Sequence, residues 1–167
     1  MGNKTKRVAT YGLLVALAFI FSYIESLIPI QSPVPGIKLG FANIVVMITL
    51  FWLGEREAFS MAIIRVVLSG LTFGNMMMMM YSLAGSLLSC ICMILLKKTN
   101  RFSMVGISIT GGVMHNVGQI ILAIIILDTI QLYYYLPVLI ISGVLTGVLI
   151  GILGSQIIKH LPASLKP

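Results

Sequence analysis

Residues 133–158 read YYYLPVLIISGVLTGVLIGILGSQII, and this stretch decides the fold class of the chain. It contains no charged residue and exceeds the length of about 20 apolar residues that a helix needs to cross a hydrocarbon core. Over the whole chain, 59% of the residues are hydrophobic and 9% are charged, with a mean hydropathy of +1.09. A small soluble domain needs a mostly polar surface, so this composition predicts an all-α integral membrane protein.

Further apolar segments precede this one, and we predict about six transmembrane helices. Their approximate spans are residues 8–28, 39–53, 58–71, 76–96, 103–127 and 133–158. The second and third segments are short for a complete crossing, and we expect residues 54–57 to join them in a tight turn. Short or Gly/Pro-interrupted segments often mark the binding site of a transporter. No linker or low-complexity tail interrupts the pattern, so residues 1–167 are predicted to form a single transmembrane domain.

The basic residues predict the orientation, because Lys and Arg favour the cytoplasmic side of short loops. If the N-terminus is cytoplasmic, then the following residues are cytoplasmic too: Lys4, Lys6, Arg7, Arg56, Lys97, Lys98, Arg101, Lys159 and Lys166. Lys38 then lies outside and Arg65 within the membrane. We therefore predict a multi-pass protein with both termini in the cytoplasm. The net charge of +7 is attributed to this topology and to contact with anionic membrane lipid, and no nucleic-acid partner is expected.

A Pro/Gly-rich stretch precedes the second segment and ends at Asn43. Proline fixes the backbone and glycine permits tight turns, so we expect Pro35 and Gly36 to form part of a gate. Lys38 is the one basic residue predicted in an outer loop, and Asn43 follows it one short step into the membrane. We interpret this stretch as a lid over an outward-facing pocket that Lys38 and Asn43 help to line.

Arg65 lies near the middle of the third segment, where a buried arginine costs about 2.5 to 3.5 kcal/mol and calls for a partner. Ser69 continues its face at helical spacing, and Asn75 follows just beyond the outer end. One interpretation is that the planar guanidinium binds an anion or the polar headgroup of a ligand. The other is an internal ion pair with Glu25 or Asp128. The two are compatible, and the sequence leaves both open.

The fifth segment contains His115, Asn116 and Gln119, and His115 and Gln119 lie one turn apart on one face. A lone buried histidine is usually a packing residue, but three polar side chains in an apolar helix favour the lining of a cavity. Counting from the cytoplasmic ends places Arg65 and His115 near mid-depth, with Asn43 and Gln119 in the outer half. No second histidine or cysteine stands at ligand spacing, so we predict no metal, no cofactor and no catalytic residue.

Small residues recur at helix-contact spacing in the inner half of the predicted bundle. They are Gly12 with Ala16, Ala58 with Ala62, and Gly143, Gly147 and Gly151. Such faces allow close approach between helices, so internal packing is the simplest interpretation. The pair Gly12 and Ala16 on the first helix also suits docking of another membrane subunit.

Five motifs occur in order along the chain. They are residues 35–43 (PGIKLGFAN), 65–70 (RVVLSG), 73–75 (FGN), 82–85 (SLAG) and 115–119 (HNVGQ). Together they resemble the bacterial Gx transporter family, also labelled heptaprenyl diphosphate synthase component I. The resemblance implies a bundle in a bacterial cell membrane, similar to the substrate-binding S components of energy-coupling factor transporters. It further implies a ligand in the outer half and small residues on the first helix that face a transmembrane coupling subunit, which works with ATPases.

Three functional hypotheses follow. The first is a binding and uptake protein for a small, partly apolar ligand that is vitamin-like or isoprenoid-related. The second is a quinone-handling subunit of flavin-based extracellular electron transfer, in which His115 exchanges protons and a partner protein takes the electrons. The third is a non-catalytic accessory component of heptaprenyl diphosphate synthase.

The sequence gives little support to an enzyme that acts alone. The chain has four acidic residues, whereas prenyl elongation needs paired Asp-rich motifs to hold magnesium on a diphosphate. It also lacks a Gly-Lys-Ser or Gly-Lys-Thr phosphate loop. Energy for transport is therefore expected from partner ATPases or from an ion gradient.

Overall fold

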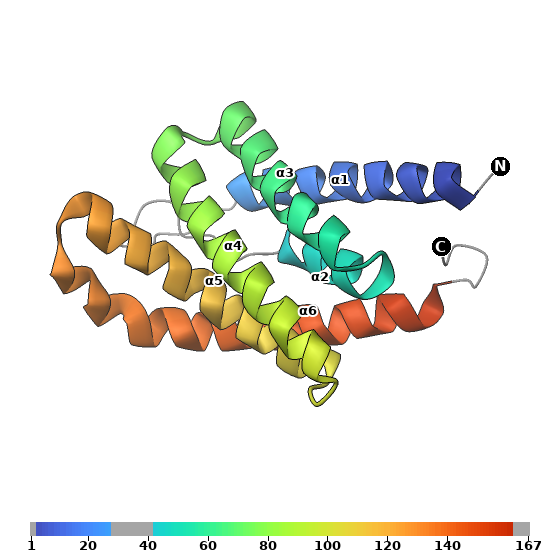
Figure 1. Cartoon of the computed structure of the whole chain (residues 1–167). Helices are drawn as coiled ribbons and strands as arrows, with labels where there is room; N and C mark the ends of the chain where they lie inside the picture. The colour runs from blue at the N-terminus through green and yellow to red at the C-terminus, as the bar shows by residue number, and fades with distance from the viewer. Residues whose placement is uncertain (1–2, 28–41, 162–167) are drawn as a thin grey trace.

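The computed structural model describes residues 3–27 and 42–161, and these form a helical bundle (Figure 1). The elements are α1 (Asn3–Leu27), α2 (Asn43–Trp52), α3 (Glu55–Phe73), α4 (Met76–Thr99), α5 (Met104–Leu127), the 3-10 helix η1 (Ile130–Tyr135) and α6 (Leu136–His160). No strand occurs in these two described ranges, which confirms the predicted all-α class. The gate residues Pro35 and Gly36, together with Lys38, lie outside the described residues.

Within the described residues, four helical stretches are long and apolar enough to cross a membrane. They are Thr5–Leu27, Met76–Thr99, Met104–Leu127 and Ile130–His160. The 19-residue α3 reaches about 28 Å, but Glu55, Arg56, Glu57 and Arg65 make it less apolar than these four. The ten-residue α2 spans only about 15 Å, which is half of a hydrocarbon core. The chain is thus a membrane-type bundle with one half-length helix.

The boundary between α2 and α3 differs from the predicted one. Residues 54–57 were expected to form a turn, whereas Glu55 and Glu57 lie in the first turn of α3. Carboxylates are favourable there because they face the positive end of the helix dipole. The reversal falls instead on Gly54, whose φ of 126° favours a glycine.

The half-length helix α2 forms the centre of the bundle. It contacts α1, α3 and α6, and every residue of 44–50 is buried. Because neighbours surround it, α2 is almost entirely apolar, and its two polar residues are Asn43 and Thr49. Its side chains contribute much of the larger hydrophobic core, together with residues of α1, α3 and α4.

Two cations hold the C-terminal end of α2. Lys97 Nζ donates a hydrogen bond to the carbonyl oxygen of Leu50 at 2.5 Å, and Arg7 Nη2 donates to that of Leu53 at 3.1 Å. The last carbonyls of a helix have no partner within the helix and carry its negative dipole end. Cations from α4 and α1 therefore fix the depth at which α2 ends.

Ion pairs join the same end of the bundle. Arg7 pairs with Glu57, and Lys98 pairs with Glu55 at 3.1 Å. Both pairs are partly exposed, so each contributes at most about 1 kcal/mol. They show that the start of α1, the start of α3 and the end of α4 meet; we call this the basic end. Three of the residues predicted to be cytoplasmic, Arg7, Lys97 and Lys98, thus lie at one end of the bundle.

Glycines allow α5 and α6 to pack backbone against backbone. A Cβ at Gly143 would lie 2.8 Å from the carbonyl oxygen of Gly112, and one at Gly147 would lie 2.6 Å from Cα of Ile109. Neither position has room for a side chain. Close approach of this kind is typical of membrane helices, which associate through small residues.

Candidate functional site

Arg65 is the centre of a buried polar cluster in the middle of the bundle. Only 6% of the residue is exposed. Its Nη2 donates hydrogen bonds to Asn43 Oδ1 at 2.9 Å and to Ser86 Oγ at 2.8 Å. The guanidinium thus ties together α2, α3 and α4. Asn43 is the first residue of α2, so it lies about 15 Å from the other end of that helix, which is at the basic end.

The charge of Arg65 has a counter-charge inside the protein. Glu25, near the end of α1, is 3% exposed and interacts attractively with the Arg65 guanidinium. Asp128, the other carboxylate considered, is exposed at the end of α5. This attraction is in line with an internal counter-charge for Arg65, and the binding of an anionic ligand by its guanidinium stays a prediction. An anionic ligand would have to compete with that carboxylate.

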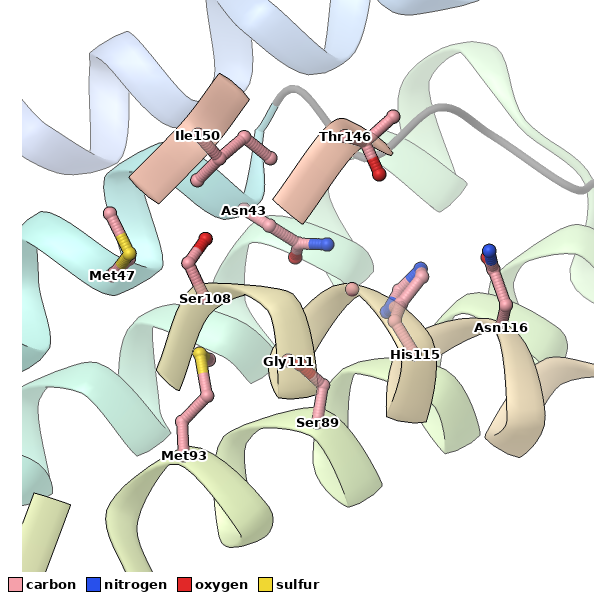
Figure 2. Close-up of a pocket in the computed structure, with 11 residues that line it drawn as sticks. Asn43, Met47, Ser89, Met93, Ser108, Gly111, His115, Asn116, Thr146 and Ile150 are labelled. Carbon is pink, nitrogen blue, oxygen red and sulfur yellow. The ribbon is translucent and has the colours of Figure 1, made fainter. Parts of the chain in front are cut away.

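A small cavity lies beside the cluster (Figure 2). Its volume is about 10 Å³, which is about the space that one water molecule or one ligand oxygen requires. The lining comes from four helices: Asn43 and Met47 of α2, Ser89 and Met93 of α4, Ser108, Gly111, Gly112, His115 and Asn116 of α5, and Thr146 and Ile150 of α6. Figure 2 shows the Asn43 amide and the His115 ring directed into the space between these helices.

The polar residues of α5 have different local roles. Asn116 Nδ2 donates to the Leu139 carbonyl oxygen at 2.7 Å and thereby anchors α6. His115 is 4% exposed and lies at the cavity. Gln119 is 1% exposed, and neither its Oε1 nor its Nε2 has a hydrogen-bond partner in the described ranges. Leaving a buried polar group unsatisfied costs about 1 to 3 kcal/mol, so burial of the Gln119 side chain without partners destabilises the folded protein.

Gly85 explains how α4 comes so close to these side chains. A Cβ at this position would lie 2.5 Å from the His115 carbonyl oxygen and 2.8 Å from Gln119 Cγ. Gly118 of α5 is equally confined, since its Cβ would lie 2.9 Å from the carbonyl oxygen of Ala84. The two glycines bring α4 and α5 together beside His115 and Gln119.

The structure brings together some of the predicted site residues and separates others. Asn43, His115 and Asn116 line the cavity. Arg65 does not line it but donates a hydrogen bond to Asn43, and Gln119 lies one helical turn after His115 on α5. Two predicted residues take up local structural roles instead. The Ser69 hydroxyl donates to the Val66 carbonyl oxygen within α3, and the exposed Asn75 caps α4 by accepting from Met78 N at 2.8 Å.

Four hydroxyl residues of the site were not predicted. They are Ser86, Ser89, Ser108 and Thr146. Isolated hydroxyl residues are common in membrane helices, where they can hydrogen-bond to their own backbone, so they do not stand out in a sequence. The one available signal was the position of Ser86 directly after the motif at residues 82–85, with Ser89 three residues further on.

The predicted partner-interface residues lie on the outside of the bundle. Gly12 and Ala16 are both exposed on α1. A Cβ at Gly12 would have no atom within 4 Å in the described ranges. The face that these two residues form is therefore not used for packing inside the described bundle.

Comparison with known proteins gives one match. The model of the family described as heptaprenyl diphosphate synthase component I matches residues 14–157, which confirms the resemblance found in the motifs. No curated protein and no solved structure matches the chain. The matched range includes the whole polar cluster and all of the residues that line the cavity.

Proposed function

The chain belongs to the heptaprenyl diphosphate synthase component I family, and from this premise we propose that it is a membrane-embedded binding protein for a small, partly apolar molecule. The observation that carries the proposal is the Gln119 amide, buried without a hydrogen-bond partner in the described ranges beside His115 and the Arg65 cluster. Buried polar groups are normally satisfied, and those within a membrane bundle commonly belong to binding sites or ion pathways.

The charges favour a neutral ligand. Glu25 attracts the Arg65 guanidinium and so offsets part of the positive charge that the buried cluster would offer to a diphosphate. The other acidic residues lie elsewhere: Glu55 and Glu57 are at the basic end, and Asp128 is exposed. The described ranges contain no group of three or more His, Cys, Asp or Glu residues that could hold a metal ion. In a heptaprenyl diphosphate synthase, this component would therefore act as an accessory to a separate catalytic subunit.

Uptake by this protein would depend on partner proteins. The exposed face of Gly12 and Ala16 on α1 is the surface that we assign to a coupling subunit of the energy-coupling factor type, because its small residues would let another helix approach closely. The partner ATPases would supply the energy, since the chain has no phosphate loop of its own.

A quinone-handling role is the second candidate, and the position of His115 favours it. Histidine is the side chain that most readily exchanges protons near neutral pH, and this one lies at the cavity. Oxidation of a quinol releases two protons and two electrons; His115 would accept the protons one at a time and pass each to water, while a partner protein took both electrons. In that case quinol-dependent reduction of an external flavin would be lost in a deletion strain, while vitamin uptake stayed normal.

The binding proposal is tested by what co-purifies with the protein. The full chain is purified in mild detergent, and bound compounds are identified by mass spectrometry for the wild type, His115→Ala and the control His160→Ala. His160 is the only other histidine and is exposed at the end of α6. We expect one small, partly apolar compound in the wild type and in His160→Ala, and much less of it in His115→Ala. Bulk phospholipid alone, or equal amounts in all three proteins, would contradict the proposal.

A further inference from the structure

An apolar groove lies where α1 and α6 flank α2. Helix α2 contacts both of them, and Figure 1 shows α1 and α6 on opposite sides of it. The groove has a volume of about 330 Å³, within the range of small-molecule sites and far above the 10 Å³ of the polar cavity. Its lining consists of Phe21 and Ile24 of α1, Ile44 of α2, and Thr146, Leu149, Ile150 and Leu153 of α6.

The groove opens to the side of the bundle. Ile24, Leu149 and Leu153 are 45%, 56% and 54% exposed, whereas Ile44 and Ile150 are 9% and 6% exposed and lie deeper. Both flanking helices are long and apolar enough to span a membrane, so this side faces lipid. Thr146 is the one lining residue with a polar side chain, and its hydroxyl donates to the Ser142 carbonyl oxygen of its own helix.

The groove and the polar cavity share part of their walls. Thr146 and Ile150 line both, and Ile44 of the groove follows Asn43 of the cavity on α2. A molecule in the groove could thus place one end between Asn43 and His115. The two volumes differ about thirtyfold, so the larger space suits an apolar body and the smaller one suits a single polar atom.

We propose that the groove binds the chain of a prenyl alcohol and that the polar cavity receives its terminal hydroxyl. This inference rests on the proposed binding function and names the class of ligand. A hydroxyl is about the size of the water molecule that the cavity could hold, and it both donates and accepts, which suits the amide and imidazole groups there. The family description names a prenyl compound, which favours a prenyl over an acyl chain.

A prenyl diphosphate fits this arrangement less well. Its head group is much larger than one oxygen atom, and the nearby Arg65 guanidinium already interacts attractively with Glu25. The open side of the groove would let a longer prenyl chain continue into the surrounding lipid. The proposal therefore requires the protein to recognise only a short segment of the prenyl chain and its terminal oxygen atom.

Groove-filling variants and defined competitors test this inference. Full-length protein in detergent is labelled with a photoreactive analogue of geranylgeraniol, and unlabelled geranylgeraniol, octadecanol and geranylgeranyl diphosphate compete. In Leu149→Trp, a large side chain enters the groove. In the control Ile152→Trp, tryptophan replaces a residue of α6 that is 47% exposed and does not line the groove. Monodispersity and thermal melting establish that both variants fold.

We expect labelling on Phe21, Ile24 or Leu153 in the wild type and about tenfold weaker binding in Leu149→Trp but not in Ile152→Trp. Geranylgeraniol should compete better than the other two compounds. Labelling spread evenly over the lipid-facing helices, unchanged binding in Leu149→Trp, or stronger competition by octadecanol or the diphosphate would overturn the inference. If a different compound co-purifies and is lost in His115→Ala while Leu149→Trp has no effect, the binding function stands and the groove assignment fails.

Discussion

Arg65 donates a hydrogen bond to Asn43 Oδ1 at 2.9 Å, and this contact joins the middle of α3 to the first residue of α2. Asn43 is half-buried, and α2 is only about 15 Å long, which is half of a hydrocarbon core. Helices that end at mid-depth are typical of the substrate sites of transporters. The half-length helix thus brings the Asn43 amide, the Arg65 guanidinium and the cavity together at one level of a mostly apolar bundle.

Loss of the hydroxyl that Arg65 contacts on α4 should destabilise the protein. Ser86→Ala removes a hydrogen bond to a charged group, which contributes about 1.5 to 3 kcal/mol, so we expect the melting temperature in detergent to fall by about 3 to 10 °C. Ser89→Ala is the matched control, since Ser89 is equally buried on α4 and lines the cavity. An equal effect of the two substitutions would contradict the role assigned to Ser86.

The attraction between Glu25 and Arg65 predicts a non-additive double mutant. Glu25→Gln removes the carboxylate that attracts the buried guanidinium, so we expect the melting temperature to fall. Arg65→Met leaves the Glu25 carboxylate uncompensated, while the double variant removes both charges and should be more stable than either single variant. Thermal melting of the four proteins measures the coupling; additive effects would show that the two charges do not stabilise each other.

Two adjacent lysines should differ in their contribution to stability. Lys97 donates to the Leu50 carbonyl oxygen and lies 5.3 Å from the centre of the Phe51 ring, whereas Lys98 makes a partly exposed ion pair with Glu55. We expect Lys97→Met to cost about 1.5 to 3 kcal/mol and Lys98→Met about 1 kcal/mol or less. Added salt should weaken only the contribution of Lys98. Melting curves at low and high salt measure both effects, and equal losses would contradict the structure of the basic end.

Two glycine-to-alanine substitutions should change stability in opposite directions. Gly85→Ala places a Cβ 2.5 Å from the His115 carbonyl oxygen, so α4 and α5 must separate, at a cost of about 1 to 3 kcal/mol. Gly12→Ala meets no described atom within 4 Å and should stabilise α1 by about 0.5 to 1 kcal/mol. Both are measured by thermal melting. If Gly85→Ala were neutral, the close approach of α4 to His115 would be wrong.

The sequence predicted the apolar helices better than the site. Residues 76–96 and 133–158 lie within helices, and the predicted segment 103–127 is helical from residue 104 onward. Long apolar runs without charges favour helices that span a membrane. The start of α3 was placed too late, because Glu55 and Glu57 look like turn residues although they suit the first helical turn. The pairing of Arg65 with Asn43 and Ser86 depends on how three helices are arranged in space, and sequence spacing along one helix does not report it.

The claim that the buried polar cluster binds a ligand is tested most directly at Gln119. Gln119→Leu removes an amide that lacks hydrogen-bond partners in the described ranges while keeping a similar volume, and Gln156→Leu makes the same change at an exposed position of α6. The measurement is the amount of co-purifying small molecule per protein, with thermal stability in ligand-free detergent recorded beside it. We predict that Gln119→Leu loses most of the bound compound without losing stability, because an unsatisfied buried amide contributes nothing to folding, and that Gln156→Leu keeps the compound. Equal ligand content in the two variants and the wild type would contradict the account.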